Sequence, residues 1–182
     1  MATKNQERKI IDKVFVLLGV AVMLVLLVAG SLGWYAHNFA INMVHTELAA
    51  QKIYFPPKGS PALDPAEFPD LQQYAGQQVD NGLKAKAYAN GFIARHLEKI
   101  AAGKTYSEVS AEAMADPTNT TLQMQKAVLF QGETLRGLLL GDGYGYWMFG
   151  EIAGYAALAA LVGSVVMFGL VLLGLRHIAR LK

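Results

Sequence analysis

The histidines are the first residues to consider for catalysis or metal binding in this chain of 182 residues. The four are His37, His45, His96 and His177, and no two of them are four residues apart. A metal site on a helix needs two ligands at that spacing, so the sequence predicts no metal site. His37 and His45 lie about two helical turns apart and can face one side of a helix. Their roles stay open, with hydrogen bonding near a membrane surface the simplest interpretation.

Carboxylates are the second class of candidate residues. Twelve of them lie between Glu47 and Glu151, against nine Lys and Arg, and no spacing among them singles out an acid and base pair. Glu151 differs because it precedes a long apolar stretch, where burying a carboxylate without a partner costs free energy. We interpret it as a carboxylate at the level of the lipid head groups and leave its role open. The chain has no cysteine, which excludes a thiolate nucleophile.

Gly141, Gly143 and Gly145 occupy alternate positions in the segment GDGYGYW. A phosphate-binding loop needs Lys and then Ser or Thr after its glycines, and a dinucleotide fingerprint needs a preceding strand; this segment has neither. The spacing predicts a hinge or a close backbone approach rather than the interior of a helix. We therefore predict no catalytic residue, no cofactor and no small-molecule substrate, and expect that the chain is not an enzyme.

Two long apolar stretches must position all of these residues. Residues 14–36 contain no charged side chain, and as a helix they cover about 34 Å, against about 30 Å for the hydrocarbon core of a bilayer. Residues 152–175 form a second stretch of the same kind. The sequence therefore predicts two transmembrane helices. The net charge of +2 is spread evenly and gives no reason to expect binding to nucleic acid.

Lys and Arg near the ends of these stretches predict the orientation, because basic residues are retained on the cytoplasmic side. The N-terminal tail, residues 1–13, contains four of them, and the C-terminal tail, residues 176–182, contains three. We expect both tails in the cytoplasm and residues 37–151 outside it, in a protein of the cell membrane. The first apolar stretch is longer than the apolar region of a signal peptide, so we expect an uncleaved anchor.

Aromatic residues mark the other ends of the two stretches. Amphipathic rings are favoured at the head-group layer of a membrane. The predicted anchors at that layer are Trp34 and Tyr35 after the first stretch, and Tyr144, Tyr146 and Trp147 before the second.

The segment between the stretches begins as a continuation of the first helix. Residues 37–52 contain neither Pro nor Gly, and apolar side chains recur there at helical spacing. Five prolines then fall within residues 56–69, which excludes helix and central strand. We predict a rigid, extended connector, with a docking strip for a partner as the alternative.

Helices are predicted for the remainder of that segment. Asp70 is the expected N-cap of a helix whose buried face is formed by Ala85, Ala89, Ile93, Leu97 and Ile100. Gly103 is expected to end this helix. Thr105 and Glu108 have the spacing of a capping box, which begins a short helix extending to about Ala115. A further helix begins near Asn119 and continues toward the second apolar stretch.

The second apolar stretch is rich in small residues, unlike the first. Small side chains at four-residue spacing allow helix backbones to approach closely in lipid. The predicted helix-packing residues are Ala156, Ala159, Ala160, Gly163 and Ser164. Packing against the first stretch and packing against another subunit are both left open.

The segments QQVDNGLKAKAYANGFIARHLEKIAAGKTYSEVSA and LFQGETLRGLLL, followed by the Ala- and Gly-rich stretch, resemble small two-span envelope proteins of high-GC Gram-positive bacteria. Similar chains occur as accessory subunits of bcc–aa3 respiratory supercomplexes. The resemblance implies a non-catalytic structural or accessory subunit of a larger membrane complex.

We therefore expect an all-α membrane hairpin with a helical extracytoplasmic domain, whose partners are the lipid bilayer and other membrane subunits or copies of itself. The alternative is an extracytoplasmic ligand-binding or sensing module that acts through a separate partner.

Overall fold

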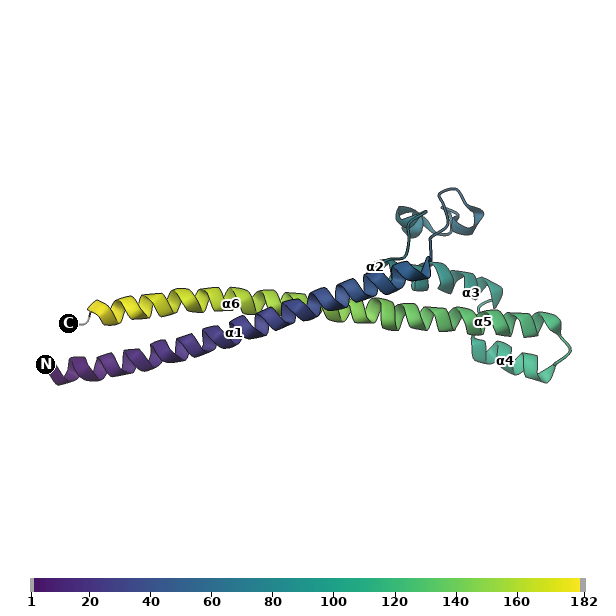
Figure 1. The fold of residues 1–182 in the computed structure, drawn as a ribbon. Helices are drawn as coiled ribbons and strands as arrows, with labels where there is room; N and C mark the ends of the chain where they lie inside the picture. The colour runs from purple at the N-terminus through teal and green to yellow at the C-terminus, as the bar shows by residue number, and fades with distance from the viewer. Residues whose placement is uncertain (1, 181–182) are drawn as a thin grey trace. The chain divides into compact units, whose positions relative to one another are not determined.

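The computed structural model describes residues 2–180, and every regular element within that range is helical (Figure 1). A single antiparallel bridge joins Tyr54 to Gln78. The predicted all-α fold is confirmed. Lys182, which contributed to the predicted orientation, lies outside the described residues, as does the side chain of Lys4.

The chain divides into two compact units. The hairpin unit consists of Met1–Phe39 and Gly150–Lys182, and the central unit consists of Ala40–Phe149. Two long helices, α1 (Ala2–Gln51) and α6 (Tyr146–Arg180), contribute to both units. The predicted continuation of the first helix past His37 is therefore confirmed. Both helices are long and apolar enough to cross a membrane.

In the hairpin unit, α1 and α6 run antiparallel and pack along a seam with spacings of three and four residues. This spacing is typical of helices packed as in a coiled coil. Along α1 the seam contains Val16, Gly19, Met23, Leu26, Gly30, Gly33 and His37. Along α6 it contains Gly150, Gly154, Ala157, Leu161, Ser164, Met167, Val171 and Gly174.

Glycines bring the two backbones of this seam close together. A Cβ atom on Gly30 would lie 2.7 Å from Leu161 Cγ and 3.1 Å from the Ala157 carbonyl oxygen. A Cβ atom on Gly33 would lie 3.1 Å from that of Ala157. Small residues at the contact are what helix association in lipid requires, because apolar burial gives little net gain there.

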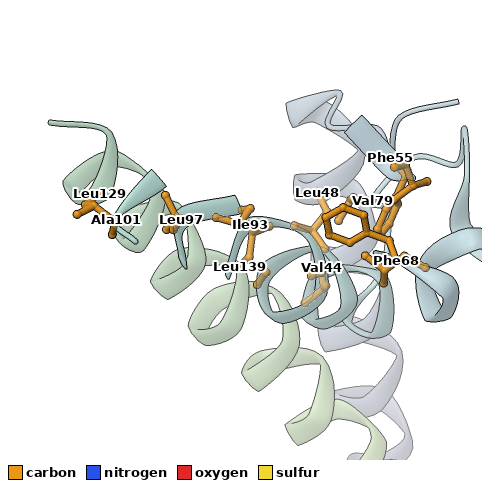
Figure 2. Packing of buried hydrophobic residues seen from close by; sticks show 14 of the residues in the cluster. Val44, Leu48, Phe55, Phe68, Val79, Ile93, Leu97, Ala101, Leu129 and Leu139 are labelled. Atoms are coloured by element: carbon orange, nitrogen blue, oxygen red, sulfur yellow. The ribbon is translucent and has the colours of Figure 1, made fainter. Parts of the chain in front are cut away.

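The central unit surrounds one apolar core (Figure 2). Besides the end of α1, its elements are the 3₁₀ helices η1 (Pro61–Leu63) and η2 (Pro69–Tyr74), the π-helices η3 (Ala87–Ile93) and η4 (Leu139–Gly145), and the helices α2 (Gly82–Lys86), α3 (Ala94–Ile100), α4 (Tyr106–Ala115) and α5 (Thr120–Leu138). Val44 and Leu48 of α1 reach this core together with Leu129 and Leu139.

The proline-rich segment 56–69 is not the extended connector that its composition predicts. Two buried aromatic residues, Phe55 and Phe68, fix it to the core, and it forms the 3₁₀ turn η1 between them. Pro61 and Pro69 occupy first turns, where a missing N–H group costs nothing. Pro57, Pro61, Pro65 and Pro69 are exposed, and the alternative of a docking strip for a partner stays a prediction.

Asp70 is not the N-cap of the following helix. That helix begins at Gly82, and the Asn81 side chain caps it by accepting a hydrogen bond from the Lys84 N–H group at 3.0 Å. Asp70 lies within η2 and pairs with Arg95 instead.

The buried stripe that follows differs from the predicted one at its end. Ala85, Ala89, Ile93 and Leu97 are buried as predicted, but the next buried residue is Ala101, and Ile100 is exposed. The π-helix η3 explains the change, because its wider turns rotate the residues that follow. The resulting stripe has a constant spacing of four residues.

The other local predictions are confirmed. Gly103 follows α3 with a φ of +79°, the left-handed conformation that glycine adopts without strain. Thr105 and Glu108 form both hydrogen bonds of a capping box, and α4 ends at Ala115. Helix α5 begins after Asn119, whose side chain is its N-cap.

Candidate functional sites

The predicted helix-packing residues of α6 divide between two environments. Ser164 is buried, and its hydroxyl donates a hydrogen bond to the Met23 carbonyl oxygen of α1 at 3.1 Å. Ala160 and Gly163 are half-buried at the edge of the seam. Ala156 and Ala159 are exposed. Helix α1 therefore covers one end of the predicted set and leaves the other exposed.

Most of the seam lies outside the predicted set of packing residues. Gly154 and Ala157 are buried against α1, although neither belongs to the predicted set. A Cβ atom on Gly154 would lie 2.7 Å from His37 Nδ1. The signal that identifies Ala157 is the seven-residue repeat of Gly150, Ala157, Ser164 and Val171, and Gly154 lies four residues after the first of these and three before the second.

The predicted aromatic anchors also lie in two different environments. Trp34 and Tyr35 are exposed on α1. Tyr144, Tyr146 and Trp147 are half-buried and pack within the central unit. Trp147 lies against Gly82, and the Tyr144 hydroxyl accepts a hydrogen bond from Lys86 Nζ at 3.2 Å. Their role at a membrane surface stays a prediction.

Three of the histidines bind backbone carbonyl oxygens through Nδ1. The partners are Gly150 for His37, at 2.8 Å, Asp80 for His45, at 2.9 Å, and Phe92 for His96, at 2.8 Å. Each contact requires a proton on Nδ1, so these rings act as donors. Among the described residues, no three His, Asp or Glu side chains are grouped as metal ligands. Glu151 is half-buried, and its role stays open.

The predicted close backbone approach is confirmed at Gly143, but the glycine segment 141–145 does not interrupt the helix. Residues 139–145 form η4, which continues directly from α5 into α6. A Cβ atom on Gly143 would lie 3.1 Å from that of Ala85 in α2. The π-helix keeps the chain helical while η4 packs against α2. π-Helical turns occur frequently at functional sites.

A cavity of about 190 Å³ adjoins η4 in the central unit. The end of α1, the end of α5 and η4 line it with mostly apolar side chains, together with the carboxylates of Glu47 and Asp142. Glu47 and Asp142 are both exposed. The sequence analysis did not predict this cavity, because its walls come from segments about ninety residues apart.

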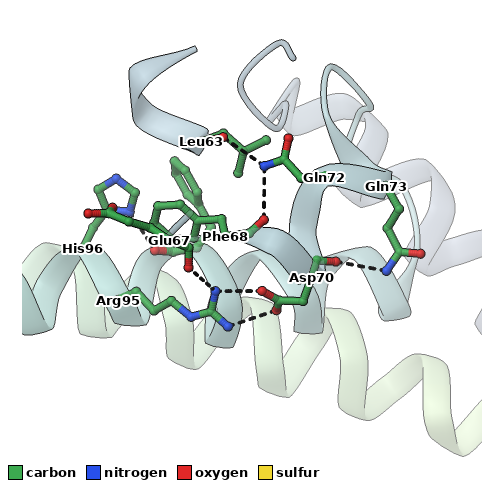
Figure 3. Close-up of polar contacts among 9 residues, drawn as sticks. Leu63, Glu67, Phe68, Asp70, Gln72, Gln73, Arg95 and His96 are labelled. Carbon is green, nitrogen blue, oxygen red and sulfur yellow. Dashed lines mark hydrogen bonds and ion pairs between the residues drawn. The ribbon is translucent and has the colours of Figure 1, made fainter. Parts of the chain in front are cut away.

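Asp70 and Arg95 form a bidentate ion pair beside the buried Phe68 (Figure 3). Arg95 Nη1 and Nη2 donate to the two carboxylate oxygens at 2.8 and 2.9 Å, and Nη1 also donates to the Glu67 carbonyl oxygen at 3.1 Å. The hydrogen bonds from Arg95 lower the pKa of Asp70 below its usual value. The pair connects η2 to α3.

Because of the Asp70–Arg95 pair, we expect a small decrease in the free energy of unfolding at acidic pH. Because the pKa of Asp70 is lowered in the folded protein, its contribution is present above about pH 4 and is lost as the pH falls through the folded pKa. We expect Asp70→Asn to lower the free energy of unfolding by about 0.5 kcal/mol at pH 7, because the pair is largely exposed. The difference from the wild type should shrink as the pH falls below about 4.

Chemical denaturation at pH 7 and pH 3 measures both quantities. Glu98→Gln, which removes another exposed carboxylate of the central unit, is the matched control and should leave the stability unchanged. A difference for Asp70→Asn that grows as the pH falls would contradict the assignment.

Comparisons of the chain with protein-family models, with curated proteins and with solved structures gave no match. The function must therefore be argued from the chain itself, and the resemblance to small two-span envelope proteins stays a prediction.

Proposed function

We propose that the chain is a non-catalytic structural or accessory subunit of a larger membrane assembly, anchored by α1 and α6. The outward faces of both helices support the membrane location. Large apolar side chains there are mostly exposed, including Leu17 at 69%, Val25 at 67% and Val165 at 71%. Soluble monomers rarely expose continuous apolar surface of this extent, whereas lipid accommodates it.

The orientation in this proposal follows from the basic residues. Lys9 and Lys13 lie near the start of α1, and Arg176 and Arg180 lie near the end of α6. Antiparallel packing brings these ends together, since Asp12 lies 3.8 Å from His177. Both ends of the chain then lie in the cytoplasm, and the central unit is extracytoplasmic.

The observation that carries the proposal is the open part of the small-residue face. Ala156 and Ala159 are exposed although α1 already packs on the adjacent side of α6. In lipid, an exposed pair of small residues allows a second helix to approach closely. That helix belongs to another subunit, for which a respiratory supercomplex is one candidate, or to a second copy of this chain.

Native electrophoresis of membranes solubilised in a mild detergent tests the proposal. The wild type should migrate far above the 19.7 kDa of the monomer. Ala159→Leu should reduce the upper band about fivefold, because a larger side chain prevents the close approach and helix contacts in lipid contribute about 1 kcal/mol each. Val165→Leu, on another face of α6, is the matched control and should leave the band unchanged.

Migration of the wild type as a monomer would contradict the proposal. That outcome would favour an extracytoplasmic ligand-binding or sensing module that acts through a separate partner. The cavity beside Glu47 and Asp142 is the observation that supports this alternative.

A further inference from the structure

The hairpin unit contains a groove between α1 and α6, near the two ends of the chain. Its volume is about 330 Å³, within the range of small-molecule sites. Asp12 and His177 line one end of it, and Gly19 and Met167 line the other. Every remaining lining residue is apolar or glycine, Phe15 and Leu170 among them. The groove therefore has one polar end and an apolar body.

The polar end contains a carboxylate oxygen that lacks a partner. Asp12 Oδ2 is out of contact with solvent and accepts no hydrogen bond from the described residues. Among the described residues, His177 Nε2 is the basic atom that approaches Asp12 Oδ2 most closely, at 3.8 Å, which is too long for a hydrogen bond. A buried polar atom without a partner costs free energy, so a group that donates to Oδ2 would bind favourably.

The chemistry of Asp12 and His177 determines which chemical group of a ligand can bind between them. A hydroxyl can donate its proton to Asp12 Oδ2 while its oxygen accepts from the neighbouring His177 nitrogen. An anion would be repelled by the carboxylate. A cation would have to be desolvated among apolar side chains and would lie against a histidine that is itself a potential cation.

We propose that the groove binds a neutral, lipid-soluble molecule that has an apolar body and a single hydroxyl at its head. The hydroxyl lies between Asp12 and His177. The apolar body lies in the rest of the groove between α1 and α6, against Phe15 and Leu170. Two sources share this chemistry, a phenol with an alkyl tail and an aliphatic lipid alcohol. The inference rests on the proposed membrane hairpin and is independent of assembly with other subunits.

Equilibrium dialysis of the full-length protein in lipid nanodiscs tests the proposal. The probes are 4-nonylphenol, 1-dodecanol and nonylbenzene, which has the same body as the first without its hydroxyl. We expect saturable binding of a hydroxyl-bearing probe above its partition into empty nanodiscs. Nonylbenzene should bind at least tenfold more weakly, because a hydrogen bond to a charged group contributes that much. The relative affinities of nonylphenol and dodecanol identify the source.

Variants locate the site. Asp12→Asn should remove most of the difference between nonylphenol and nonylbenzene. Glu7→Gln removes another carboxylate of the same helix end and should preserve the difference. Equal binding of the hydroxyl probes and nonylbenzene to the wild type, or no binding above that of empty nanodiscs, would overturn the proposal.

The comparison of probes on the wild type decides the question even if a variant fails to fold. Monomeric migration in native electrophoresis would leave this inference standing, and loss of the probe difference would leave the proposed assembly standing.

Discussion

Replacing Phe68 with alanine should lower the stability of the central unit by about 3–5 kcal/mol, the usual cost of removing a fully buried phenylalanine. Phe68 is 1% exposed, and its ring stacks on His96 with a centroid separation of 5.2 Å. Phe92 lies at 5.9 Å, and the guanidinium of Arg95 lies 5.5 Å from the ring centre. The substitution would leave a cavity and release the proline-rich segment from η3 and α3.

Hydrogen exchange of the central unit measures this loss. Amides of residues 87–100 should exchange about a hundredfold faster or more, because each 1.4 kcal/mol corresponds to a factor of ten. Phe130→Ala is the matched control, since this ring is 59% exposed on α5, and it should change exchange by less than about threefold. Equal effects of the two substitutions would show that Phe68 is not part of the core.

Elements with local signals could be predicted from the sequence. The long apolar helices need only an uninterrupted run of suitable residues. The capping box at Thr105 and Glu108 depends on side chains within three residues of the backbone groups they bind, and the helix start predicted near Asn119 is capped by an equally local contact. In each case the physical cause lies within the segment, so its sequence was sufficient.

The proline-rich segment could not be predicted in the same way. Its prolines exclude helix and central strand, but they do not determine whether the chain is extended or folded back. Burial of Phe55 and Phe68 in a core formed by distant helices decides this. The same contacts place Asp70 opposite Arg95, and the role of N-cap passes to Asn81.

The two π-helices also could not be predicted from the helical periodicity of the sequence. An average helical period assigns Ile100 to the buried face, whereas the added width of η3 places Ala101 there. In η4, alternate glycines indicate a break, yet packing against α2 keeps the segment helical. Tertiary contacts select these turns, and the local sequence leaves them undetermined.

The candidate sites were predicted only in part, because each depends on two helices at once. Four-residue spacing within α6 identifies Ser164 but cannot tell which side α1 covers. The seam on α1, with Gly19, Gly30 and Gly33, selects Gly154 and Ala157 instead. The groove at Asp12 and His177 likewise joins residues from opposite ends of the chain.

Replacing Gly30 with valine should separate α1 from α6 and destabilise the hairpin unit by about 3 kcal/mol, at the upper end of the usual cost of overpacking. A Cβ atom there would lie 2.7 Å from Leu161 Cγ and 3.1 Å from the Ala157 carbonyl oxygen. The leucine can rotate away, but the carbonyl belongs to a helix and cannot. Gly169→Val is the matched control, because no atom lies within 4 Å of a Cβ at that position.

A disulfide trap reports the separation directly, because the natural chain has no cysteine. A Cβ atom on Gly19 would lie 3.0 Å from Val171 Cγ2, so cysteines at these two positions are close enough to form an intramolecular disulfide. In membranes, the trap should close efficiently in the wild-type and Gly169→Val backgrounds and poorly in the Gly30→Val background. Equal closure in all three backgrounds would mean that the contact at Gly30 does not hold the two helices together.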